Sequence, residues 1–301
     1  MAIAHEPQAF LIRWRLPWTS IQSEANYNNS IMETGYFVER NSIVRQIWGN
    51  GDTILFIFAG AAAEFALNKA VDWLYFTGKL PADPLGRLFS TVSYARKIVF
   101  SEKQDALRAI ETIASIHSAV ESKRGALIPD WAYRDVLFML IDYSIRSYEL
   151  LERKLAFAEK QEVFDVFYRI GIGMGLTGLP QSFTEFEKMR AEHLQENMQY
   201  SRFTKDLFRQ YRKHLGGARY RILLESQKLV VPTNVRELLG FGRISIFKPL
   251  IGMYKFSRKL KADWLLKELI LPAKYKDEIK SLDREPRGSP QSQSQSQSQS
   301  Q

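Results

Sequence analysis

Hydrophobic residues along the chain recur at spacings of three and four residues, which is the pattern of α-helices with one buried face. Apolar and polar residues do not alternate over any stretch long enough to predict a β-strand. The sequence therefore predicts an all-α fold. The expected helices cover residues 52–76 (with Asp52 as N-cap), 87–100, 102–124 (capped by Ser101), 130–155, 157–170, 183–200, 203–215 and 219–229, followed by shorter basic helices from 233 to 271.

The chain is long enough for one large domain, and its hydrophobic content of 45% can fill a core. We expect an aromatic-rich N-terminal arm over residues 1–45, where the periodicity is weak, and a single helical domain over 46–272. A basic linker and a Gln/Ser tail occupy 273–301. The repeated Gln-Ser pairs carry no apolar side chain that could offset the entropy lost on ordering, so this tail is expected to be disordered.

The absence of cysteine excludes disulfides, a thiolate nucleophile, cysteine-ligated zinc, iron–sulfur clusters and a thiolate haem. The chain has four histidines, His5, His117, His193 and His214. A site with three histidines would need nearly all of them, including one in the N-terminal arm. Any metal in this protein is therefore expected to have a single histidine ligand.

His117 is the most informative of the four because it stands on an apolar stripe of its helix. Its helical neighbours are small, so a flat group could approach the imidazole closely. Two interpretations stay open: a core histidine bonded to a carbonyl oxygen, or the proximal ligand of a haem iron. The stripe consists of Leu107, Ile110, Ile113, Ala114, His117 and Val120.

The segment before that helix carries a second candidate group. Arg87 and Thr91 are four residues apart, with Ser90 between them, so both are expected on one helical face. Facing a cavity, the pair could bind dioxygen or a haem propionate. The alternative is that these residues form an exposed helix start.

Several motifs of the chain occur in the order and at the spacing that are typical of a known family. They are Asp83-Pro84-x2-Arg87 with Thr91, Ile113-x2-Ile116-His117-x2-Val120, the block Tyr133–Tyr143, the loop Arg169–Pro180, the segment His214–Tyr220 and the segment Gln227–Pro232. In this pattern, from about Val44 to Leu271, the chain resembles the family of the fungal MpaB oxygenases and the bacterial rubber oxygenase, or latex clearing protein. The resemblance covers about three quarters of the chain.

The resemblance implies an all-α, globin-related fold around a b-type haem (iron), with His117 as proximal ligand and Arg87 and Thr91 on the distal side. Three positions depart from the family pattern. Ser90 stands where rubber oxygenase has a lysine before the distal threonine. Asn68-Lys69 replaces a common His-Pro pair, and a second common histidine falls near Leu137.

The function that follows is a haem b-dependent oxygenase, which cleaves a carbon–carbon double bond of a lipophilic, isoprenoid-like substrate with dioxygen. Haem would carry the chemistry, and the protein would supply a carboxylate base. Glu64, isolated in an apolar helix, is the first candidate for this base, and Asp72, further along the same predicted helix face, is the second. The alternative is a non-catalytic helical lipid-binding protein that acts at a membrane surface.

Charge is distributed unevenly along the chain. Residues 202–301 hold 21 Lys and Arg against 9 Asp and Glu, whereas residues 1–201 hold 21 against 24. An anionic membrane surface is therefore a candidate partner, contacted through residues 202–287, and no nucleic-acid module is recognised. The longest apolar run is too short to span a bilayer and no secretory signal is evident, so we expect a cytoplasmic protein, with peripheral membrane attachment left open.

Overall fold

The structure is a computed structural model that describes residues 35–78, 82–242 and 244–259. Its helices are α2 (Ile43–Trp48), α3 (Gly51–Phe65), α4 (Asp72–Phe76), α6 (Pro84–Phe100), α7 (Lys103–Arg124), α8 (Asp130–Leu151), α9 (Phe157–Gly173), α10 (Phe183–Glu196), α11 (Arg202–Val230), α12 (Thr233–Leu238) and α13 (Lys248–Lys259). Within these residues there are two isolated β-bridges and no strand. The all-α prediction is confirmed.

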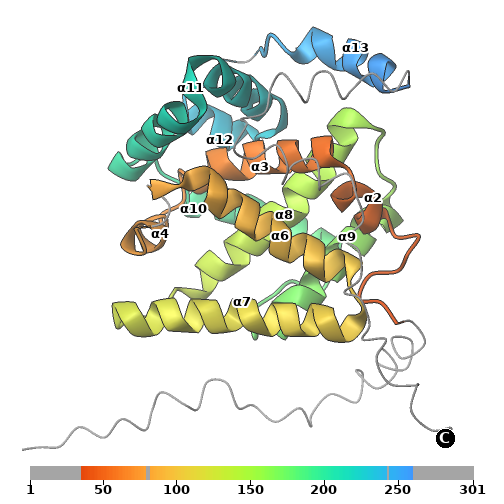
Figure 1. Cartoon of the computed structure of the whole chain (residues 1–301), viewed down its shortest axis with the longest axis vertical. Coiled ribbons are helices and arrows are strands. Elements are labelled where there is room, and N and C mark those ends of the chain that lie inside the picture. Colours follow the sequence, from red (N-terminus) through yellow and green to blue (C-terminus); the bar gives the residue numbers. More distant parts are fainter. Residues whose placement is uncertain (1–34, 79–81, 243, 260–301) are drawn as a thin grey trace, which may run out of the picture.

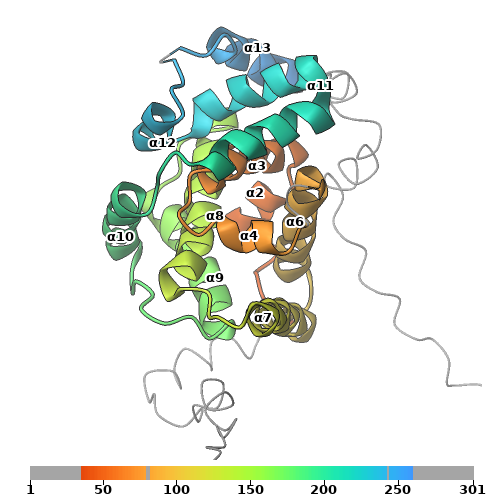
Figure 2. The same ribbon diagram turned by 90° about the vertical axis from the view of Figure 1, so that its left-hand side faces the viewer.

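The helices form a bundle whose two ends are built from different parts of the chain (Figures 1 and 2). Helices α11, α12 and α13 lie at one end, and α7 lies at the opposite end in both views. Helix α3 runs through the interior, where it packs mainly on α8 and α11. This central position explains why most of its apolar side chains are buried and the others are partly buried.

The contact between α3 and α8 is unusually close at Gly60. A Cβ atom at this position would lie 2.3 Å from the ring of Tyr143, which is fully buried on α8. Only glycine leaves room for the ring, and the approach brings the phenol of Tyr143 next to the last turn of α3. Trp48 of α2 also binds to α8, since its Nε1 donates to Ser144 Oγ at 3.1 Å.

Side-chain caps define where several helices begin, and two predicted caps are wrong. Asn50, and not Asp52, caps α3: its Oδ1 accepts hydrogen bonds from the amides of Asp52 and Thr53. Ser101 does not cap α7, because the N-cap position is Glu102 and no side chain bonds there. Helix α6 begins at Pro84, earlier than predicted, because the Asp83 carboxylate accepts from the amide of Gly86.

The predicted helix over 52–76 is wrong, because the chain leaves the helical path after Phe65. Asn68 accepts a hydrogen bond from the amide of Ala70 through its own Oδ1, which forms a tight local turn. The backbone on either side of Asn68 bonds to the α10–α11 connection. The amide of Lys69 donates to Asn197 O at 3.0 Å, and Leu67 O accepts from the amide of Gln199 at 2.8 Å. Helix α4 then starts separately at Asp72.

Several helix ends differ from the sequence prediction. Helix α8 ends at Leu151 and α10 at Glu196, each four residues before the predicted end, whereas α9 continues to Gly173, three residues beyond it. The two helices predicted over 203–215 and 219–229 lie within α11, whose helical path is broken at Gly216 (φ 74°, ψ 170°), so the predicted division is confirmed. The prediction had the right place for the break, since this backbone conformation is open almost only to glycine.

The ends of the predicted domain are described in part. Phe37 and Val38, inside the predicted N-terminal arm, are buried in the main core, and the expected boundary at residue 45 falls inside α2. The last predicted basic helix, the linker and the Gln/Ser tail lie at residue 260 and beyond, outside the described residues. Within the described part of the chain, no helix is long and apolar enough to cross a membrane.

Candidate active site

His117 lies on α7 with its side chain turned toward α8. Its Nδ1 is buried and has no hydrogen-bond partner among the described residues. The imidazole meets the ring of Tyr133 edge-on, with the centroids 5.2 Å apart. Tyr133 is held in turn by its hydroxyl, which donates to Glu121 Oε1 at 3.0 Å. A buried ring nitrogen without a partner is unusual, and it is available to a ligand.

The apolar stripe predicted around His117 is only partly right. Ile110 is buried, and Ile113 and Val120 are half-buried together with His117, but Leu107 is 40% exposed. Helix α7 lies at the end of the bundle, where it packs on α6 and α9 and leaves its outer side to solvent. The stripe is therefore narrower than the sequence pattern indicated.

Burial and, to a smaller extent, the positive charge of Arg87 together lower the pKa of His117 to about 4. The imidazole is therefore neutral at physiological pH. Neutral imidazole is the form that binds a metal through a ring nitrogen. The neutral state of the imidazole and its buried nitrogen without a partner are both properties expected of a metal ligand.

Arg87 and Thr91 lie on one face of α6, as their spacing predicts. Arg87 Nη1 donates to Thr91 Oγ1 at 2.9 Å and to Ser90 Oγ at 3.2 Å. Burial also lowers the pKa of Arg87. Because α6 packs on α7 and the charge of Arg87 acts on His117, the structure brings these two predicted site residues together.

Glu64, the first candidate base, lies in a different environment. It is fully buried at the end of α3, where Arg190 of α10 binds both of its oxygens, at 2.5 and 2.6 Å. The Tyr143 hydroxyl donates to Glu64 Oε2 at 2.7 Å. Burial raises the pKa of Glu64, and the charge and hydrogen bonds of Arg190 partly offset this. The carboxylate is part of a buried network between α3, α8 and α10.

The rest of this network was not predicted from the sequence. Arg190 also binds Asp142 at 3.2 Å and lies 3.6 Å from Asp135, which is fully buried. Asp135 contacts His193 and accepts from Asn68. Asn68, at the position of the family's His-Pro pair, therefore has a structural partner. The sequence did contain a signal for this network: Arg190 and His193 share the apolar face of α10, and buried polar side chains need polar partners. The other residues of that buried face are Phe183, Phe186 and Leu194.

Asp72 does not share a helix face with Glu64, because α3 ends before it. Its carboxylate is 37% exposed and accepts from Arg124 Nη2 at 2.6 Å. Arg124 also lies over the ring of Trp73, 3.9 Å from the centroid. Arg124 ends α7, seven residues after His117 and therefore on the same side of that helix. Asp72 is thus connected to the helix that carries His117, whereas Glu64 is connected to α10.

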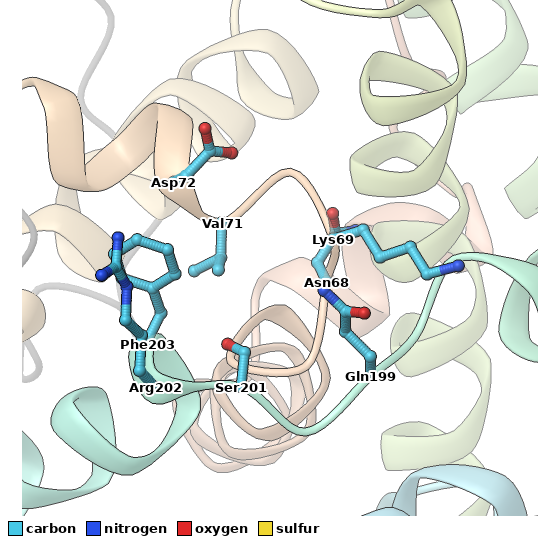
Figure 3. Close-up of a pocket in the computed structure, with 8 residues that line it drawn as sticks. All are labelled: Asn68, Lys69, Val71, Asp72, Gln199, Ser201, Arg202 and Phe203. Carbon is cyan, nitrogen blue, oxygen red and sulfur yellow. The ribbon is translucent and has the colours of Figure 1, made fainter.

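A cavity of about 370 Å³ opens beside Asp72 (Figure 3). Val71 and Asp72 line it from the α4 side, together with Asn68 and Lys69. The α10–α11 connection and the start of α11 supply the opposite side. Asp72 lines this cavity, whereas Glu64 is fully buried and does not line it.

Among the described residues, no group of three or more His, Asp or Glu side chains could hold a metal ion. Leu137, near the position of the family's second histidine, is buried in the main apolar core. The expectation that any metal has a single histidine ligand stays a prediction. The buried Nδ1 of His117 has no hydrogen-bond partner, whereas Nε2 of His193 contacts Asp135. The arrangement is that of an all-α protein with a neutral imidazole, whose buried Nδ1 has no partner, near a half-buried arginine.

A comparison with protein families places the chain. A family model described as the catalytic domain of the ER-bound oxygenase mpaB/B' and rubber oxygenase matches residues 46–253. The chain therefore belongs to this family of oxygenases, which supports an oxygenase-type, oxidoreductase function and confirms the resemblance seen in the sequence. No curated protein and no solved structure gives a significant match.

Proposed function

We propose that the protein is a haem b-dependent oxygenase that cleaves a carbon–carbon double bond of a lipophilic, isoprenoid-like substrate with dioxygen. The observation that carries the proposal is the His117 imidazole, which is neutral and has a buried Nδ1 without a partner. The substrate class follows from the name of the family, which includes rubber oxygenase.

The residues present fit a haem. His117 would hold its iron, and the chain has no cysteine that could compete for it. When bound, haem supplies dioxygen binding and the redox steps of oxygen insertion, for which amino-acid side chains are not suited. Tyr133 packs against the imidazole and would limit its rotation, which holds the ligand in one orientation.

Arg87 and Thr91 would act on the side of α6 that faces α7. The hydrogen bond between them fixes the guanidinium in place and leaves further N–H donors of Arg87 for an acceptor. A haem propionate is one such acceptor, and dioxygen is another. Ser90, in the position of the family's lysine, offers a hydroxyl that already donates to Arg87 O at 2.9 Å, so it is a weak candidate for a ligand.

The contacts of the two candidate bases favour Asp72. Both oxygens of Glu64 are engaged by Arg190, and one of them also accepts from Tyr143, so moving a proton onto Glu64 would disrupt three hydrogen bonds. Asp72 has one charged partner and lines the cavity. We therefore propose Asp72 as the base and a structural role for Glu64.

The experiment is reconstitution of the purified chain with haem, followed by absorption spectroscopy. Wild-type protein should show a Soret band, and His117→Ala should lose it while its helical circular dichroism is retained. His214→Ala is the matched control, because His214 is exposed on α11 and should leave the band unchanged. The haem-loaded protein should convert an isoprenoid oligomer to carbonyl products.

Absence of a Soret band in the wild type, or its full retention in His117→Ala, would contradict the assignment of His117. A protein that binds no haem and still binds isoprenoid lipids would instead be the non-catalytic lipid-binding protein considered from the sequence.

A further inference from the structure

Two isoleucines project from the connection between α12 and α13. Ile244 is 78% exposed and Ile246 is 69% exposed, more than any other large hydrophobic side chain among the described residues. Exposed isoleucines are common singly, but two that flank one buried residue are not an ordinary feature of a solvated loop. The residue between them, Ser245, is 3% exposed.

Ser245 and its neighbours are fixed to α11, which makes this projection a defined structure. The Ser245 hydroxyl lies 3.1 Å from Glu225 O and 2.9 Å from Glu225 Oε2. The amide of Ile246 donates to the same carboxylate oxygen at 2.9 Å. The other oxygen of Glu225 accepts from Lys228 at 2.6 Å. The connection is therefore held inward at Ser245, and both isoleucines are held outward.

Exposed basic residues stand on the two helices that flank this connection. Arg221 is exposed on α11 one turn before Glu225, and Lys248 is exposed at the start of α13. Across residues 202–259 the sequence contains 14 Lys and Arg against 3 Asp and Glu. The excess positive charge of this segment would attract an anionic surface to this end of the bundle.

We propose that the face formed by Ile244, Ile246, Arg221 and Lys248 docks on an anionic lipid bilayer, with the two isoleucines inserted among the lipids. Apolar side chains that enter the interface, combined with lysine and arginine near anionic headgroups, are the combination that binds peripheral proteins to membranes. We call these four residues the docking face.

The charge of the docking face argues for lipid over a second copy of the chain. A symmetric contact would bring two strongly basic surfaces together, which repel each other. Two isoleucines also provide far less apolar area than a stable protein interface requires. A bilayer needs only a small inserted side chain because the attraction between opposite charges supplies the remainder.

Docking would be independent of the proposed catalysis. Helix α7, which carries His117, lies at the end of the bundle opposite to α11 and α13 (Figures 1 and 2). Docking there gives no direct path from the bilayer to His117, so substrate delivery through this face is not proposed. Its failure and the failure of the haem assignment have separate readouts.

The test is flotation of the full chain with vesicles of phosphatidylcholine and phosphatidylserine, and with vesicles of phosphatidylcholine alone. Binding is expected with the anionic vesicles and should fall as salt shortens the Debye length from about 10 Å to about 3 Å. Ile244→Ser combined with Ile246→Ser should weaken binding at least roughly tenfold. Arg221→Glu combined with Lys248→Glu should weaken it as strongly.

Matched controls separate the docking face from general properties of the chain. Ile172→Ser removes a half-exposed isoleucine of α9, and Lys123→Glu reverses an exposed charge on α7; both should bind like the wild type. Equal binding to neutral vesicles, no binding to anionic ones, or equal losses in the controls would overturn the proposal. A dimer in sedimentation analysis that the isoleucine variant abolishes would also overturn it.

Discussion

Arg190 neutralises a group of carboxylates that water hardly reaches. Its guanidinium binds Glu64 through two short contacts, binds Asp142 at 3.2 Å and lies 3.6 Å from Asp135. Each partner alone would be a buried charge, which is costly to keep without compensation. The surrounding acids raise the pKa of Arg190 well above its ordinary value, despite its burial. The residue is therefore essential to the contact between α10 and the α3–α8 pair.

Replacing Arg190 should destabilise the protein strongly. Arg190→Met leaves Glu64 buried without its cation, and we expect the free energy of unfolding to fall by about 3–5 kcal/mol. Urea denaturation followed by circular dichroism measures this change. Arg108→Met is the control, because Arg108 forms an exposed pair with Asp105 outside the network and should cost less than about 1 kcal/mol. Equal losses in the two variants would contradict the role given to the network.

The free His117 nitrogen has a consequence for the dependence of stability on pH. In the folded chain the pKa of His117 is about 4, whereas its ordinary value is 6.5. Below pH 6.5 the unfolded chain binds a proton that the folded chain does not, so stability is lost as the pH falls from 6.5 toward 4. The loss in the haem-free protein should approach about 3 kcal/mol at the lower limit.

Urea denaturation at a series of pH values checks this expectation, with His117→Asn as the control that cannot titrate. The difference between the two proteins isolates His117 from the carboxylates that also titrate in acid. A wild-type curve parallel to that of His117→Asn between pH 6.5 and 4 would show that the imidazole is not buried as described.

Residue spacing was sufficient to find some of the site and not the remainder. Arg87 and Thr91 meet because both belong to one helix, and a spacing of four fixes their relation. The pairing of Glu64 with Arg190 joins residues 126 positions apart. No local pattern predicts which acid a buried arginine will face, since that depends on how α3 and α10 pack.

At the scale of elements, α11 shows how one glycine shapes a helix. Gly216 has φ 74° and ψ 170°, a conformation that other residues adopt only with strain, and it divides α11 into two segments. The first segment packs on α3 and the second carries Glu225, which holds the docking face. The kink therefore sets the direction of the segment from which that face is built.

Gly216→Ala should lower the free energy of unfolding by about 1–3 kcal/mol, because alanine must be strained into this conformation or the kink must change. Thermal denaturation measures the effect. Gly217→Ala is a direct control: Gly217 has no atom within 4 Å of an added Cβ and no positive φ, so alanine there should be neutral or stabilising by up to about 1 kcal/mol. A loss of the same size at Gly217 would argue against a specific strain at Gly216.

Helix identity was predictable from the sequence, whereas several helix ends were not. The spacing of apolar residues by three and four located most of the long helices, because a helix that buries one face must place its apolar residues at that spacing. The break after Phe65 was missed because apolar residues continue beyond it, through Leu67 to Trp73. What ends the helix is polar and partly distant: the Asn68 side chain bonds to a nearby amide, and its neighbours bond to residues 197–199.

At the scale of the whole molecule, chemistry and charge are separated along one axis. Helix α7, which carries His117, lies at one end of the bundle, and the excess of lysine and arginine is concentrated in the segment that forms α11–α13 at the other end. The sequence revealed the uneven charge, but not the distance between the two regions, since helices α8 to α10 that separate them in sequence fold back into the middle of the bundle.

The junction after α3 also constrains how the chain can fold during its synthesis. Lys69 donates to Asn197 O at 3.0 Å, and Gln199 donates to Leu67 O at 2.8 Å, so the end of α3 is completed by a segment made much later. At ordinary translation rates the ribosome needs on the order of 10 s to add the residues between Glu64 and Arg190. Throughout that interval the nascent chain carries an apolar helix with an unpaired acid at its end. A trigger-factor-like chaperone that shields α3 should therefore improve the yield of folded protein more than one that acts after release.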